Sequence, residues 1–144
     1  MRVSKKSEYA VRALVEIALR ASEGGEWRQI SQIAEATRIP EKFLEQILLT
    51  LKKRGLLQSR RGVVGGYALN REPEAIDLET IIDILDGDSA EEKEVADPGA
   101  EVYRRVMAHS EAAARAILRA TTLAALTEQA KKIRGTGVGM DYHI

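Results

Sequence analysis

The sequence predicts a mostly α-helical fold with a small β-wing: a winged helix-turn-helix domain followed by a long C-terminal helix. Three patterns predict it: two short helical segments joined by a few residues, an Arg- and Gly-rich hairpin directly after them, and a long helical stretch from residue 98. Each pattern is common, but this order is much less so. We expect the winged domain over 1–87, an acidic linker over 88–97, C-terminal helices over 98–134 and a flexible tail over 135–144.

The first predicted helix covers residues 4–21, with Ser4 as its N-cap. Apolar residues occupy more than one of its faces. We therefore expect it to be covered on two sides, by its own domain and by another element or subunit. Gly24 and Gly25 end it.

The helix-turn-helix follows. A short helix is expected over 31–37, Arg38 and Ile39 form a tight connection, and Pro40 suits the first turn of the next helix, which Gly55 ends. The spacing i, i+3, i+4, i+7 predicts its buried side, formed by Leu44, Ile47, Leu48 and Leu51. Its opposite side carries Lys42, Gln46, Leu49 and Lys53, with Glu45 beside them.

The next segment reads as a β-wing. Strands are expected over 57–60 and 67–69, and the loop over 61–66 holds three glycines, which permit a tight turn with positive φ. Two arginines, Arg60 and Arg61, lie near its tip.

The second half of the chain reads as three helices. Asp77 is the expected N-cap of a helix that runs to about Asp86. From Pro98 a long helix begins, Thr121 and Thr122 interrupt it, and a last helix continues to about Arg134.

Charge is divided unevenly along the chain, although the net charge is zero. Residues 1–71 hold 14 Lys and Arg against 7 Glu, a net +7, and residues 72–144 hold 8 against 15, a net −7. A basic front half favours a polyanion as partner, although charges also simply solvate surfaces.

Composition excludes several classes of protein. Cysteine is absent, which excludes disulfides, thiolate nucleophiles and cysteine-ligated zinc or iron–sulfur clusters. His109 and His143 are isolated, so we expect no metal and no cofactor. No secretion signal or membrane-spanning run is present, which predicts a cytoplasmic protein without membrane contact. A nucleophile–base pair and a cofactor fingerprint are also lacking, so we expect no enzyme.

Double-stranded DNA is the expected partner of the polar side of the second short helix. Lys42 can donate to guanine, Gln46 can pair with adenine and Glu45 can accept from cytosine. Arg61 at the wing tip can enter the minor groove. The alternative for the helix residues is an ordinary solvated face.

Backbone phosphates are expected to meet a second group of residues, around the wing and the start of the first helix. The alternative at the N-terminus is a frayed basic end. The expected phosphate contacts are Ser4, Lys5, Lys6, Ser7, Tyr9, Arg60 and Gly62.

The chain resembles the Rrf2 family of bacterial transcription regulators. The resemblance is carried by MRVSKKSEYAVRAL, IAEATRIPEKFLEQILLTLKKRGLLQSRRGVVGGYAL, AIDLETIIDILDG and TTLAAL. It implies that Lys42, Glu45, Gln46 and Arg61 read DNA, and that the helix from about Pro98 to Ala120 is a dimerisation helix. The resemblance implies a sequence-specific regulator. In its simplest form this is a repressor that binds a palindromic operator as a homodimer.

Metal-sensing members of this family carry three cysteines between the fourth and fifth helices, where this chain has none. The Gly-rich segment that ends in Met140 to Ile144 is similar to the tail of the cysteine-free, CymR-like subgroup of cysteine-metabolism repressors. That resemblance implies cysteine synthase (O-acetylserine sulfhydrylase) as partner, with Tyr142, His143 and Ile144 docking in its active site. The alternative is a disordered end.

Two further functions stay open at this stage. One is a regulator of another pathway that senses a small ligand at the dimer interface. The other is an interaction adaptor without DNA binding, against which Gln46 and Arg61 argue.

Overall fold

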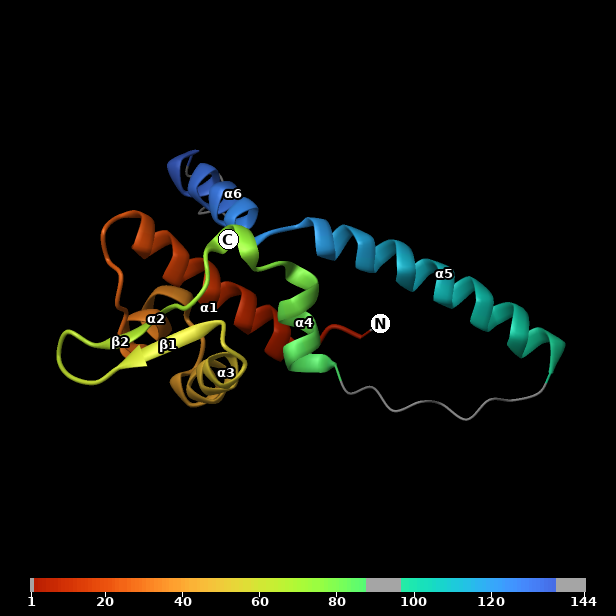
Figure 1. The fold of residues 1–144 in the computed structure, drawn as a ribbon, viewed down its shortest axis with the longest axis horizontal. Helices are drawn as coiled ribbons and strands as arrows, with labels where there is room; N and C mark the ends of the chain where they lie inside the picture. Colours follow the sequence, from red (N-terminus) through yellow and green to blue (C-terminus); the bar gives the residue numbers. More distant parts are fainter. Residues whose placement is uncertain (1, 88–96, 137–144) are drawn as a thin grey trace, which may run out of the picture.

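The described part of the chain, residues 2–87 and 97–136 of this computed structural model, is mostly helical with one short hairpin (Figure 1). This is the predicted fold class. In chain order the elements are α1 (Lys5–Ser22), α2 (Ile30–Thr37), α3 (Glu41–Lys53), β1 (Leu57–Arg60), β2 (Gly66–Leu69), the 3₁₀ turn η1 (Pro73–Ala75), α4 (Leu78–Asp86), α5 (Pro98–Ala120) and α6 (Leu123–Thr136).

Helix α1 lies at the centre of the fold. Ser4 is its N-cap, as predicted, and its side chain accepts a hydrogen bond from the Ser7 amide. Helices α2, α3 and α4 and strand β2 contact α1, and α6 of the same chain contacts it as well, above it in the view of Figure 1. The second cover that its wide apolar surface requires is therefore supplied by α6.

Helices α2 and α3 form the helix-turn-helix. Arg38 between them has a φ of 57°, a left-handed conformation that reverses the chain. Leu44, Leu48 and Leu51 are fully buried with Ile47 beside them, which confirms the predicted inner side. Full burial of each such side chain stabilises the fold by about 1.5–3 kcal/mol.

Pro40 corrects one expectation. It is the N-cap of α3 and not a residue of the first turn, because its ψ is not helical (φ −54°, ψ 129°) while its carbonyl already accepts from the Leu44 amide.

The hairpin is a two-stranded antiparallel sheet in which Leu57 pairs with Leu69 and Arg60 with Gly66. Arg28, just before α2, forms a reciprocal backbone bridge to Tyr67 of β2, with N–O distances of 2.7 and 2.9 Å. This bridge joins the wing to the helix-turn-helix.

Helix α4 begins at its predicted cap, where Asp77 accepts from the Thr80 amide at 2.8 Å. The corner between α5 and α6 is tied to this start: the Leu78 amide donates to the Thr121 carbonyl and the Leu123 amide to the Ile76 carbonyl. The corner is thus part of the domain, and α5 extends away from it (Figure 1).

Two boundaries differ from expectation. Asp97 caps α5 by accepting from Gly99 and Ala100, so it belongs to the helix and not to the linker. Helix α6 runs to Thr136, two residues beyond the expected end. Most of the predicted linker (88–97) and of the predicted tail (135–144) lies outside the described residues.

In the described ranges, no helix combines the length and the apolar character needed to cross a bilayer.

Candidate nucleic-acid interface

Three polar side chains occupy the outward side of α3 near its N-terminus. Lys42, Glu45 and Gln46 are all exposed, because the leucines at the intervening positions turn inward. Their side-chain polar atoms have no hydrogen bond or ion pair to any described residue. The donors and acceptors of this surface are therefore available to an external partner.

Two exposed apolar residues accompany them. Phe43 and Leu49 are both about half exposed, although α3 buries four other apolar side chains. The helical periodicity places Leu49 on the outward side, but it gave no sign that Phe43 would remain uncovered. Apolar side chains in a major groove can contact thymine methyl groups.

The turn that presents α3 is held from α1. The Arg12 guanidinium donates to the Thr37 carbonyl, at the last residue of α2. The Thr37 hydroxyl in turn donates to the Ile33 carbonyl at 2.6 Å. These contacts satisfy carbonyls at the C-terminal end of α2 and fix the entry to α3.

The two arginines of the wing differ in their contacts with the described residues. Arg61 is exposed and has no partner among the described residues, as expected for a DNA contact. Arg60 lies over the Trp27 ring, 4.4 Å from its centroid, and donates to the Val64 carbonyl at 2.7 Å. Gly62 has a φ of 103°, which only glycine adopts readily, and makes the turn beside Arg61.

The predicted phosphate contacts at the start of α1 differ in whether their side chains already contact other described residues. Lys6 is exposed and unpaired within the described chain. Lys5 pairs with Glu8 at 2.8 Å, which lowers the pKa of that carboxyl. Lys5 and Arg12 both lie over the Tyr9 ring, with cation–centroid distances of 5.5 and 5.4 Å.

Ser7 does not fit a phosphate contact. It is 1% exposed, and its hydroxyl donates to Asp86, which also accepts from the Ser4 amide at 2.9 Å. Burial alone would raise the pKa of Asp86, but these hydrogen bonds and the charge of Lys6 lower it by more. A carboxylate of the chain itself therefore occupies the N-terminus of α1, and we leave Ser7 out of the proposed interface.

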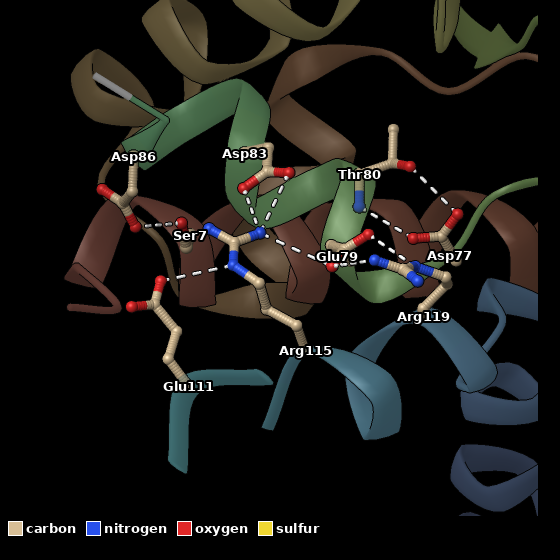
Figure 2. A network of polar contacts seen from close by, with 9 residues as sticks. All are labelled: Ser7, Asp77, Glu79, Thr80, Asp83, Asp86, Glu111, Arg115 and Arg119. Atoms are coloured by element: carbon tan, nitrogen blue, oxygen red, sulfur yellow. Dashed lines mark hydrogen bonds and ion pairs between the residues drawn. The ribbon is translucent and has the colours of Figure 1, made fainter. Parts of the chain in front are cut away.

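Figure 2 shows a second polar region, between α4 and α5. The Arg115 guanidinium contacts Glu79, Asp83 and Glu111 at 3.2–3.5 Å, and Arg119 contacts Glu79 at 3.0 Å. The hydrogen bond from Arg119 is the largest cause of a lowered pKa at Glu79. The polar side of α5 thus faces its own domain.

The apolar side of α5 is left uncovered. No residue of α5 is buried, and large apolar side chains recur along it at helical spacing. This exposed stripe consists of Val102, Tyr103, Val106, Met107 and Ile117. Several large apolar side chains exposed along one side of a helix indicate an interaction surface.

Metal-ligating residues do not gather in the described ranges: no three His, Asp or Glu side chains come together there. The predicted tail residues Tyr142, His143 and Ile144 lie outside those ranges.

Comparison with known proteins gives one matching family model. It is Rrf2, described as an iron-dependent transcriptional regulator, and it matches residues 3–129. The iron in that description does not fit this chain's donor set, because the sequence holds no cysteine and the described residues hold no cluster of other ligands.

Two curated relatives illustrate the similarity. The regulator CymR of Bacillus subtilis is 37% identical over 87 residues, and the regulator IscR of Cereibacter sphaeroides 34% over 86 residues, each over 60% of this chain. The matched segments span 62% and 56% of those relatives' own lengths. Both are named HTH-type transcriptional regulators, which agrees with the expectation that the chain is not an enzyme.

Solved structures extend the similarity over most of the chain. The structure of CymR, the global cysteine regulator of B. subtilis, matches with a TM-score of 0.77 and 30% identity, over 90% of this chain and 98% of that one. An IscR structure from T. potens has a TM-score of 0.75 and 31% identity, with 90% and 88% coverage. The winged-helix fold and the sequence resemblance are thereby confirmed.

Proposed function

Since the chain belongs to the Rrf2 family of transcriptional regulators, we propose that it binds a palindromic operator in double-stranded DNA as a homodimer and acts as a repressor. One observation carries the proposal: the side chains of Lys42, Glu45 and Gln46 are exposed on the outward side of α3 and, like Arg61 on the wing, have no partner among the described residues. A recognition helix and a wing are the two parts that such a domain uses on a duplex.

The two parts have different tasks. In the major groove Lys42 donates to guanine, Gln46 pairs with adenine and Glu45 accepts from cytosine. Arg61 enters the adjacent minor groove, where narrow A·T-rich stretches concentrate negative potential. Lys6 is the best placed phosphate contact of α1, since it is exposed and forms no ion pair or hydrogen bond with a described side chain.

Dimerisation follows from the exposed stripe on α5. Because the polar side of α5 is used by α4, we assign its exposed stripe of Val102, Tyr103, Val106, Met107 and Ile117 to contact with the same stripe of a second copy. Small residues between them, including Ala113 and Ala116, permit close approach of two helices. A two-fold dimer presents two recognition helices and so requires an operator with two inverted half-sites.

The test is selection of binding sites by the purified chain from a random-sequence duplex library, followed by anisotropy titration. We expect an inverted repeat, bound with an affinity that falls on the order of 1,000-fold between 50 and 200 mM salt. No enriched sequence, or a single unrepeated half-site bound by a monomer, would contradict the proposal.

We further propose that the regulated genes serve cysteine metabolism and that cysteine synthase is a partner. Support comes from the similarity to the global cysteine regulator and from the resemblance of Tyr142, His143 and Ile144 to the tail of that subgroup. Calorimetry of the 144-residue chain, with Ile144 as its last residue, against cysteine synthase tests this. Binding that a chain without Ile144 loses supports the proposal, whereas equal binding or none contradicts it.

A further inference from the structure

The wing tip exposes two valines more fully than any other large apolar side chain in the described part of the chain. Val63 is 97% exposed and Val64 is 79% exposed. They stand at the outer end of the hairpin, close in sequence to Arg61, which has no partner among the described residues. A hairpin tip of polar residues would be better solvated, so this placement calls for a partner that covers apolar surface.

The loop that carries the valines is held firmly from outside. The Gln29 side-chain amide donates to the carbonyls of Gly62, Val63 and Gly65 at 3.0–3.1 Å. Arg60 donates to the remaining loop carbonyl, that of Val64, at 2.7 Å. Four successive carbonyls thus accept from side chains that lie outside the loop.

Glycine makes this arrangement possible. A Cβ at Gly65 would lie 2.0 Å from the Arg60 carbonyl oxygen, so only glycine permits the chain to fold back this closely. The Gly65 amide then donates to the Gly62 carbonyl at 3.0 Å and closes the turn. With its backbone bonded in this way, the tip loses little further entropy when a partner covers the valines.

The neighbouring charges identify the chemistry of the partner. Arg60 and Arg61 directly precede the turn that carries the valines, and no carboxylate of the described residues pairs with either arginine. A surface that is cationic at its edge and apolar at its tip matches a DNA minor groove, whose rims are phosphates and whose walls are deoxyribose carbons. Proteins that enter this groove combine basic and apolar side chains in the same way.

We propose that Val63 and Val64 enter the minor groove beside the half-site, pack against its deoxyribose walls, and are positioned there by Gln29. This inference rests on the proposed DNA-binding function and adds specificity-determining residues to it. Because the walls are close enough for simultaneous contact only in a narrow groove, the valines favour A·T-rich flanking sequence that the protein does not read by hydrogen bonds.

The experiment compares the full chain with the Val63→Ser/Val64→Ser variant on the selected operator, with either A·T-rich or G·C-rich flanks under the wing. We expect the variant to bind the A·T-flanked duplex about tenfold more weakly and the G·C-flanked duplex nearly as the wild type does. The salt dependence should not change, since no charge is removed. A Val63→Ile/Val64→Ile control should keep the flank preference.

Gln29 is tested by a double-mutant cycle, because it also caps α2 and its loss could act on the fold alone. Gln29→Glu places a carboxylate against three carbonyls and should weaken binding to the A·T-flanked duplex about as much as the serine pair does. In the serine background it should cost almost nothing more, since the valines through which it acts are gone. Additive losses would show that Gln29 acts independently of the valines.

The outcomes separate this inference from the function on which it rests. If the wild-type chain selects no operator, the proposed function fails. If it binds the operator but the serine variant binds both duplexes as the wild type does, the insertion of the valines into the minor groove is wrong, while the proposed DNA-binding function is retained. A uniform loss on both duplexes would assign the valines to general affinity and would also overturn the flank preference.

Discussion

Glu79 on α4 and Arg119 on α5 form a two-pronged ion pair, with Nε 3.0 Å from Oε1 and Nη2 3.2 Å from Oε2. Arg115, one turn earlier on α5, contacts the same carboxylate at 3.5 Å and Asp83 at 3.2 Å (Figure 2). One carboxylate thus joins two arginines of the helix that we assign to dimerisation. These pairs join the C-terminal half of α5 to α4.

We expect Glu79→Gln to lower the melting temperature, because the neutral amide no longer attracts the two guanidinium groups. The pairs are partly solvated, so the difference from wild type should shrink in 1 M NaCl, where the Debye length is about 3 Å. Scanning calorimetry at low and high salt measures it. Glu128→Gln is the control and should have little effect, since the described partner of Glu128 is Lys131 on its own helix. Equal melting temperatures for wild type and Glu79→Gln at low salt would show that the pairs do not stabilise the fold.

Asp86 gives the fold a pH dependence whose sign can be stated. Its pKa in the folded chain is lowered, so deprotonated Asp86 stabilises the fold above the ordinary aspartate pKa of about 3.9. This contribution is lost as the pH falls through the lower folded value. Asp86→Asn, which keeps a carbonyl acceptor for Ser4 and Ser7, should be less stable than wild type at neutral pH, and the gap should close below about pH 4. Urea unfolding across pH 2–7 measures both curves, and parallel curves would contradict the assignment.

The inner side of α3 could be predicted from the sequence because it depends only on local spacing. Leu44, Ile47, Leu48 and Leu51 are buried as the helical period requires. The caps Ser4 and Asp77 were predictable for the same reason, since a cap bonds amides three residues away. Pro40 was placed one residue wrongly, which is within the uncertainty of any helix boundary.

Contacts between residues that are distant in the sequence could not be predicted, because they produce no periodic spacing. Ser7 lies in the first turn of a basic helix, where the sequence suggests a phosphate contact. Its hydroxyl instead donates to Asp86, which comes 79 residues later in the chain. Gln29 precedes a helix and looks like an ordinary cap, yet its amide reaches carbonyls 33–36 residues further on. A single sequence carries no periodic signal for hydrogen bonds of this kind.

Base reading and phosphate anchoring should separate in their variants. Gln46→Ala should relax the preference at one base pair of each half-site by about 1–3 kcal/mol, because a bidentate contact is lost from an exposed position. Lys6→Gln should weaken all sequences equally and reduce the slope of log K against log salt by about two in a dimer, one for each protomer. Anisotropy with single-base operator variants at several salt concentrations measures both. The same uniform loss for the two variants would mean that Gln46 does not face the bases.

Metal removal should leave DNA binding unchanged. Cysteine is absent, so the chain offers none of the thiolates that hold iron–sulfur clusters. The described residues also hold no cluster of His, Asp and Glu that could bind another metal. Purified protein should be colourless, and dialysis against EDTA should not alter its affinity for the operator. Elemental analysis before and after dialysis is the control. A stoichiometric metal that is lost together with DNA affinity would contradict the prediction.

Ile117 provides the sharpest test of the dimer, because it is 68% exposed in the single chain and lies at the end of the α5 stripe nearest the domain. An aspartate there meets water in a monomer, so Ile117→Asp should leave the helical content of the single chain intact. In a dimer the same carboxylate would be buried against the partner helix without a counter-charge, which costs several kcal/mol and should favour the monomer. Sedimentation velocity should show a dimer for wild type and for the apolar control Ile117→Val, and a monomer for Ile117→Asp. Operator affinity should fall with dimerisation, because one protomer contacts only one half-site. If the aspartate variant stays dimeric with unchanged operator affinity, α5 does not form the interface through this stripe, and the surface that joins the two copies must be sought elsewhere on the chain.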